Sequence, residues 1–128
     1  MDYYSKTPED KRNNRLASFA RVYGEGHITT KTCDRLASGE WLEVFMAVEL
    51  DKLVGFSVYG EGLSATVIRP DYRGKGLATI LINMKTSKYP DNTAIVSLDN
   101  TASLQTMFKT GYIIKGYLYP HLVIMARN

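Results

Sequence analysis

Two glycines and two basic residues stand together where a strand-like segment runs into a helical one. The strand-like segment ends at Pro70, and Arg73-Gly74-Lys75-Gly76 then leads into an apolar stretch with helical spacing. The first turn of a helix has backbone N–H groups without internal partners, and its dipole adds about half a positive charge. Gly74 and Gly76 lack a Cβ, so a phosphate could approach those N–H groups closely. The pattern therefore predicts an anion site.

The rest of the loop is compatible with a bound phosphate. Ala78 is small, and Arg73 and Lys75 add formal positive charge, although either side chain could instead face solvent. Other glycine-rich phosphate loops do not fit. A dinucleotide fingerprint needs a third glycine shortly after Gly76, but the next glycine is Gly111, and the Walker A pattern is absent. The alternative to an anion site is that the glycines only shape a turn.

At this point the sequence resembles a known family. The segment Arg73-Gly74-Lys75-Gly76-Leu77-Ala78 is similar to the R/Q-x-x-G-x-G/A motif of the Gcn5-related N-acetyltransferases, the GNAT family. The lead-in Ile68-Arg69-Pro70-Asp71-Tyr72 is similar to that family's approach to the loop. Asn100, with Lys109-Thr110-Gly111-Tyr112 after it, resembles the family element that follows its fifth strand. The resemblance covers nearly the whole chain.

This resemblance implies an acetyl-coenzyme A site and direct transfer of the acetyl group to a primary amine. The pantetheine arm of the cofactor would pair with the strand that carries Val67 and Ile68. Asn100 is implied as a cofactor contact, while its alternative role is to cap the following helix. The pyrophosphate would be held by the loop residues Arg73, Gly74, Lys75, Gly76, Leu77 and Ala78, with Thr79 adjacent.

Acetyl transfer also needs a base for the amine and a proton for the departing thiolate. Glu61 is the predicted base, because related enzymes often use a carboxylate in this region; its alternative is a solvated turn residue. The family's usual acid is a tyrosine, but Met107 occupies that position and cannot donate a proton. Tyr112 and Tyr117 are possible substitutes. Met107 keeps a second interpretation open, a non-catalytic coenzyme A-binding regulatory or interaction module.

Hydrophobic periodicity predicts the elements that must hold the loop. A first helix is expected to start at Thr7-Pro8-Glu9-Asp10 and to bury Leu16, Phe19, Ala20 and Tyr23, and a second to cover 31–38 with Thr30 as its cap. Strands are expected at 43–49, 53–59 and 63–69, and again at 93–98, where the strand should be buried.

The remaining elements are a helix after the loop, a short helix at 101–109 and a terminal strand pair at 112–117 and 121–125. The helix after the loop should bury Leu77, Ile80, Leu81 and Met84 and close at Lys85, Lys88 and Pro90. The order predicts an α/β fold of the α+β type, with a mostly antiparallel mixed sheet flanked by helices. We expect one N-acetyltransferase domain over residues 1–128.

Composition limits the other classes of function. The chain has 128 residues, a formal charge of +3, 45% apolar residues and a lone cysteine, Cys33, which exclude a disordered tail and a disulfide-stapled miniprotein. The start at Met1 lacks the apolar region of a secretory signal and no apolar stretch is long enough to span a bilayer, so we expect a cytoplasmic protein.

The same survey sets the expectations for partners. Residues with metal-ligand spacing are absent, so no metal is expected, and His27 and His121 are assigned to surface or packing roles. The acceptor is expected to be an amine-bearing small molecule or a protein amine. Nucleic-acid binding through Lys11, Arg12 and Arg15 is a weaker alternative, because a solvated helix face is the simpler explanation. The terminal strand pair could mediate a homodimer.

Overall fold

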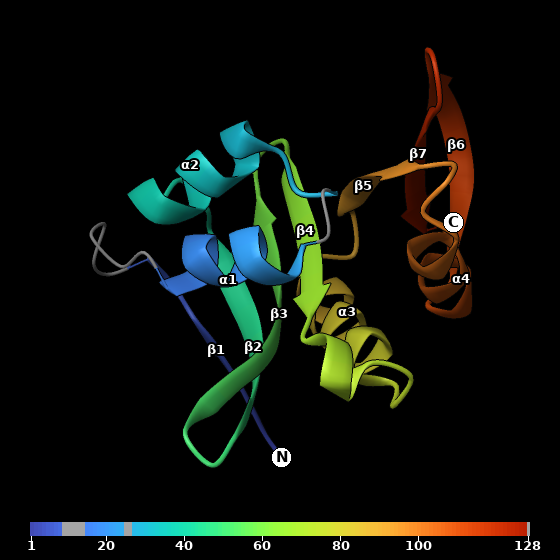
Figure 1. Ribbon diagram of the computed structural model, residues 1–128. Helices are drawn as coiled ribbons and strands as arrows, with labels where there is room; N and C mark the ends of the chain where they lie inside the picture. Colours follow the sequence, from blue (N-terminus) through green and yellow to red (C-terminus); the bar gives the residue numbers. More distant parts are fainter. Residues whose placement is uncertain (9–14, 25–26, 128) are drawn as a thin grey trace.

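The computed structural model describes residues 1–8, 15–24 and 27–127 (Figure 1). The elements follow one another as β1 (Asp2–Lys6), α1 (Arg15–Tyr23), α2 (Thr30–Ser38), β2 (Glu43–Glu49), β3 (Lys52–Gly60), β4 (Leu63–Ile68), a 3-10 turn (Pro70–Tyr72), α3 (Leu77–Lys88), β5 (Thr93–Ser97), α4 (Thr101–Lys109), β6 (Tyr112–Leu118) and β7 (Leu122–Arg127). None of the helices in these described ranges is long and apolar enough to cross a membrane.

The strands form two antiparallel sheets that separate between β4 and β5. The first has the order β1-β2-β3-β4 and the second the order β5-β7-β6. β4 contacts β5 but pairs only with β3 among the described strands, and β5 pairs only with β7. Figure 1 shows β5 beginning beside β4 and carrying the chain toward the second sheet. The expected antiparallel strands with flanking helices are confirmed, but the described strands form two separate sheets without a parallel pair rather than one mixed sheet.

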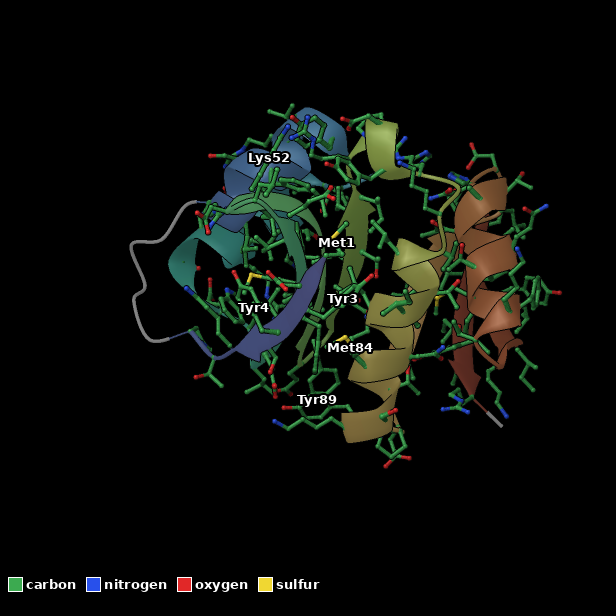
Figure 2. The ribbon with its side chains drawn as sticks, turned by 90° about the horizontal axis from the view of Figure 1, so that it is seen from below. Met1, Tyr3, Tyr4, Lys52, Met84 and Tyr89 are labelled. Atoms are coloured by element: carbon green, nitrogen blue, oxygen red, sulfur yellow. The ribbon has the colours of Figure 1, made fainter. Side chains whose placement is uncertain are left out.

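Helices cover both faces of the first sheet. Leu16, Phe19 and Leu36 of α1 and α2 pack on one face, against a core that includes Phe56 and Val58. Leu77 and Leu81 of α3 pack on the other face, against strand residues such as Phe45 and Ile68. Side chains on the two faces alternate along each strand. Figure 2 shows α3 against this sheet on the side of Met84 and Tyr89, with α4 beyond it.

α3 also contacts the second sheet, and this corrects the expected buried face. Ile80 is 39% exposed, whereas Ile82 is buried with Met107 and Val123 in the core of the second sheet. Because α3 lies between two sheets, its buried positions form two stripes rather than one. Lys85, expected among the residues that close the helix, lies on the stripe of Leu77 and Leu81 and is 1% exposed.

The other expected elements agree within a residue or two, with three differences. β1 was not predicted, because all five of its residues are exposed at the edge of the sheet and carry no alternation. Thr29, not Thr30, caps α2 by accepting a hydrogen bond from the Thr32 N–H. β5 is half-buried, with Ile95 59% exposed. The expected first turn of α1 at Glu9-Asp10 lies outside the described residues.

A buried polar network joins α3 to the second sheet. The Tyr112 hydroxyl accepts a hydrogen bond from Asn92 Nδ2 at 2.8 Å and shares one with Thr86 Oγ1 at 2.9 Å. All three side chains are at most 3% exposed. The network holds the second sheet against the helix that follows the glycine loop.

We expect Tyr112→Phe to destabilise the protein by about 1–3 kcal/mol, because it leaves the Asn92 amide and the Thr86 hydroxyl buried with fewer partners. The free energy of unfolding in urea measures the effect. Tyr117→Phe, on the same strand but 72% exposed, is the control and should change the stability by less than about 0.5 kcal/mol. Equal effects of the two substitutions would contradict the network's role.

Candidate functional site

The glycine loop joins the end of β4 to the start of α3 in left-handed turns. Gly74 has φ +77°, and Gly76, the N-cap of α3, has φ +80°. A Cβ placed on either glycine would meet no atom of the described chain within 4 Å. No side chain among the described residues caps α3, so the N–H groups of its first turn lack a side-chain partner there. A diphosphate fits here, because the loop offers N–H donors and room for close approach.

Cationic side chains fix the loop and add positive charge to it. Arg73 is turned back onto the fold: its Nε donates to the Ile68 carbonyl at 3.0 Å and its Nη2 to the Tyr23 carbonyl at 2.9 Å. Lys75 Nζ lies 5.2 Å from the centre of the Tyr72 ring. Of the two basic residues, Arg73 therefore ties the loop to the end of α1, while Lys75 stays exposed at the loop.

The edge of β4 that faces β5 carries backbone groups without strand partners. The Arg69 N–H donates to the Val54 carbonyl, so in the antiparallel ladder the backbone of Val67 and Ala65 also faces β3. The N–H and C=O groups of Ile68, Thr66 and Ser64 face the other way. Of the two strand residues expected to pair with a pantetheine arm, Ile68 thus presents its N–H to this edge, and Val67 does not.

Glu61, the predicted base, lies at the opposite end of β4 from the glycine loop. Its side chain is exposed on the β3–β4 turn, in a shallow polar groove that also includes Lys31 and Asp34. Arg35 of α2 fixes this turn by donating to the carbonyls of Glu61 and Gly62, at 2.7 and 3.2 Å. The structure brings the loop residues and Ile68 together and leaves Glu61 apart from them.

The residues at α4 have clear local roles. Asn100 caps α4, its side chain accepting a hydrogen bond from the Ser103 N–H at 3.3 Å. Met107 is buried in the core of the second sheet. Of the substitutes for the missing tyrosine acid, Tyr112 is buried with its hydroxyl already bonded, whereas Tyr117 is exposed on β6.

A row of polar residues crosses the α3 face of the first sheet. Glu43, Tyr59 and Ser64 lie opposite one another on β2, β3 and β4. Each meets a residue at the end of α3. Lys88 Nζ lies 2.7 Å from the Glu43 carboxylate, the Tyr59 ring stacks on Tyr89 at 3.9 Å, and Lys85 Nζ donates to Ser64 Oγ at 3.0 Å.

The two ends of this row differ in electrostatics. Burial alone would raise the pKa of Glu43, but hydrogen bonds from Lys88 and Tyr89 outweigh it and hold that pKa below its ordinary value. Lys85 makes no ion pair with any described residue, and burial lowers the pKa of its amine to about 7. Sequence reasoning missed Lys85; its spacing of four and eight residues from Leu81 and Leu77 was the available signal.

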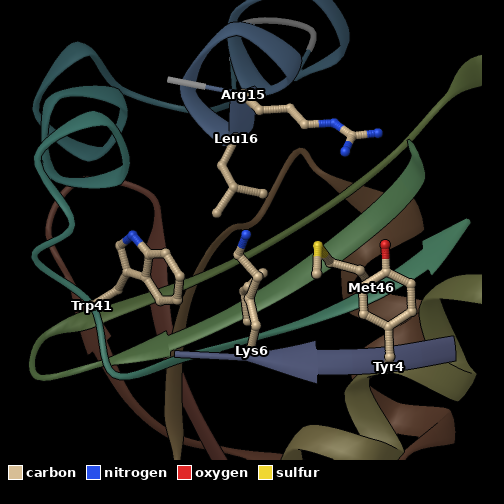
Figure 3. Close-up of a pocket in the computed structure, with 7 residues that line it drawn as sticks. Tyr4, Lys6, Arg15, Leu16, Trp41 and Met46 are labelled. Atoms are coloured by element: carbon tan, nitrogen blue, oxygen red, sulfur yellow. The ribbon is translucent and has the colours of Figure 1, made fainter. Parts of the chain in front are cut away.

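A separate small cavity of about 60 Å³ lies where α1 meets β1 and β2 (Figure 3). Leu16, Trp41 and Met46 form its apolar walls, and Lys6 and Tyr4 of β1 reach it from the strand edge. It is on the face of the sheet opposite α3. Within the described ranges, no group of three or more His, Cys, Asp or Glu side chains is placed to hold a metal. Of the basic cluster at α1, only Arg15 and Arg21 are described, and Arg21 lies 3.8 Å from Asp34.

Comparison with known proteins identifies the fold. No family model and no curated protein sequence matches the chain. Solved structures do match over almost its whole length. A GNAT-family acetyltransferase from Streptococcus pneumoniae is 16% identical with a TM-score of 0.67, and 97% of each chain is covered. The chain therefore has the fold of the GNAT acetyltransferases, and its strand-loop-helix site lies where β4 and β5 part.

Two further structures extend the likeness. The PaiA N-acetyltransferase from Thermoplasma acidophilum, in complex with coenzyme A, is 14% identical over 100% of both chains, with a TM-score of 0.63. The spermidine N-acetyltransferase SpeG from Vibrio cholerae, as an F149A mutant, is 14% identical with a TM-score of 0.68. That match covers 98% of this chain and 93% of SpeG.

Proposed function

We propose that this protein is an acetyl-coenzyme A-dependent N-acetyltransferase, which moves the acetyl group directly to a primary amine. The observation that carries the proposal is the continuity of two binding features. The backbone edge of β4 that lacks a strand partner runs into the open, left-handed Gly74–Gly76 loop at the start of α3. An edge strand suits an extended chain with amide groups, and a helix start suits a diphosphate. Coenzyme A has both parts in that order.

The roles of the chain's residues follow from this arrangement. The N–H groups from Gly74 to Ala78 would hold the diphosphate, with Thr79 beside them, and Lys75 would add charge. Ile68 and Thr66 would pair with the amides of the pantetheine arm, and an N–H of the same edge would donate to the thioester oxygen as it gains charge. Glu61 remains the proposed base, reached through water because it lies at the far end of β4.

The coenzyme A complex of PaiA, on the same fold, supports the choice of co-substrate. The name of the spermidine enzyme supports an amine as acceptor, and we propose an amine-bearing small molecule or a protein amine, handled in the cytoplasm. A second candidate, a coenzyme A-binding module without catalysis, is favoured by two observations. Met107 stands where the family's acid is expected, and the Tyr112 hydroxyl is already engaged.

Calorimetry with coenzyme A and acetyl-coenzyme A, followed by a thiol-release assay over a panel of amines, tests both candidates. The transferase predicts binding of both ligands and acceptor-dependent release of the thiol. Binding without release on any amine would leave the non-catalytic module. Absence of binding would contradict both candidates, and the matched glycine variants considered in the Discussion provide the control for the loop.

A further inference from the structure

The proposed reaction lacks a proton donor for the leaving thiolate. Met107 cannot donate a proton, and Tyr112 is buried with Thr86 and Asn92 as its partners. Tyr117, the other candidate, is 72% exposed on β6. We therefore consider a donor on another element that borders the β4 edge. The α3 side of this edge is the relevant one, because α3 carries the loop that would hold the diphosphate.

The length of the pantetheine arm limits where the sulfur can lie. The arm has about twelve single bonds and spans roughly 15 Å when extended. The distance along β4 from Ile68 back to Ser64 is about 13 Å at 3.3 Å per residue. An arm that pairs with β4 from Ile68 onward runs back along the strand past Thr66, and its sulfur comes within reach of Ser64 only when the arm is fully extended.

Thr66 and Ser64 both point toward α3, but only Ser64 is hydrogen-bonded to an ionisable group that could supply a proton. Thr66 Oγ1 is hydrogen-bonded to Ser57 Oγ at 2.7 Å, and serine does not titrate in the physiological range. Ser64 Oγ accepts a hydrogen bond from Lys85 Nζ at 3.0 Å. Because an ammonium can only donate, this contact leaves the Ser64 hydroxyl proton to be directed elsewhere, and the Ser64 side chain is half-buried rather than sealed.

We propose that Ser64 donates the proton to the thiolate of coenzyme A and that Lys85 replaces that proton. The proposal rests on the N-acetyltransferase function above. As the amine nitrogen bonds to the acetyl carbon, the C–S bond breaks and its electron pair goes to sulfur. The Ser64 Oγ–H proton moves to sulfur, and a Lys85 Nζ–H proton moves to Ser64 Oγ. The acceptor nitrogen loses its proton through water to Glu61, the proposed base, and the neutral Lys85 takes a proton back from water.

The charged surroundings of Lys85 fit this role. Its pKa of about 7 lies below the value near 8.5 of an ordinary thiol, so transfer from Lys85 to a thiolate through Ser64 is downhill. The titratable groups on the elements packed around it are Glu43 on β2, Tyr59 on β3, and Lys88 and Tyr89 at the end of α3. Glu43 is paired with Lys88 and Tyr89, and Tyr59 stacks on Tyr89.

The test uses two ligands that differ only at the sulfur position. Desulfo-coenzyme A carries hydrogen there, and coenzyme A sulfonate carries a permanent negative charge. The titration midpoint of Lys85 is followed by NMR on protein with carbon-13-labelled lysine, and Lys85→Met assigns the signal. We expect the sulfonate to raise the midpoint by about one pH unit relative to desulfo-coenzyme A, because a nearby anion favours the charged amine. The Lys88 midpoint serves as the internal control.

Each outcome has a distinct meaning. Binding of both ligands with the same Lys85 midpoint would overturn the inference and leave the cofactor site intact. If neither ligand binds, the proposed function itself fails. Once an acceptor is found, Ser64→Ala and Lys85→Met should each lower kcat by at least about 10-fold and abolish its fall near pH 7, where Lys85 loses its proton. Lys88→Met should keep kcat and its pH profile; unchanged kcat in Ser64→Ala would also overturn the inference.

Discussion

Lys85→Met is expected to raise the free energy of unfolding by roughly 3–5 kcal/mol at pH 7 or below. Lys85 is 1% exposed and makes no ion pair among the described residues, so the folded state holds its charged form at a cost. Methionine has a similar length and no charge, so it fits the same space and removes that cost. It also gives up the hydrogen bonds that Lys85 Nζ donates to Ser64 Oγ and to the Val58 carbonyl, which makes this range an upper bound.

The pH dependence of this gain has a definite sign. Burial lowers the pKa of Lys85 from 10.5 in the unfolded chain to about 7 in the fold. Between those values the unfolded state binds a proton that the folded state does not, so wild-type stability rises with pH. The advantage of Lys85→Met should therefore be constant below pH 7, shrink as the pH rises, and vanish near pH 10.5.

Urea unfolding of both proteins between pH 6 and 10 measures this difference. Lys88→Met is the matched control on the same helix, and we expect the opposite sign. Lys88 pairs with the buried Glu43 carboxylate, so its loss leaves that charge with fewer partners. A Lys85→Met variant less stable than the wild type at pH 7, or a gain independent of pH, would contradict the argument.

Gly76→Val is expected to weaken coenzyme A binding by at least about 100-fold, or about 3 kcal/mol, with only a modest loss of stability. A Cβ at Gly76 meets open space within the described fold, so the substitution is limited mainly by the positive φ, at about 1–2 kcal/mol. The same open space is where the proposed diphosphate must approach the start of α3. The valine methyl groups would fill it.

Gly62→Val isolates the effect on binding from the effect on the backbone. Gly62 also has a positive φ, +62°, and its nearest contact to an added Cβ is Arg35 Nη1 at 3.9 Å, but it lies on the β3–β4 turn. We expect the two variants to lose similar stability in thermal unfolding, while only Gly76→Val loses coenzyme A binding in calorimetry. Equal losses of affinity would mean that the loop does not hold the diphosphate.

Local patterns made the glycine loop predictable. Its residues are contiguous, and a strand end, two glycines and a helix start are each visible in the sequence between Ile68 and Leu77. The mostly antiparallel topology followed from the order of such patterns. β1 could not be predicted, because an exposed edge strand has no buried face that would require apolar and polar residues to alternate.

The contact between Lys85 and Ser64 could not be predicted from local sequence patterns. It joins residues 21 positions apart, and it depends on α3 being covered on two sides. A lysine near the end of a helix normally reaches solvent. Lys85 is buried because the second sheet and the polar row of Glu43, Tyr59 and Ser64 cover this end of α3. Ile80 was misplaced for the same reason, since one buried stripe was assumed where two exist.

The backbone edge of β4 without strand partners also affects the tendency of the ligand-free protein to associate with other chains. A strand whose amides lack partners is a template on which the strand of another chain can add, which is how many proteins begin to aggregate. Here that template runs through the middle of the molecule, between two sheets, rather than along its rim. On the proposed function, coenzyme A completes the hydrogen bonding of β4, so the same molecule that supplies the acetyl group also shields the chain from self-association.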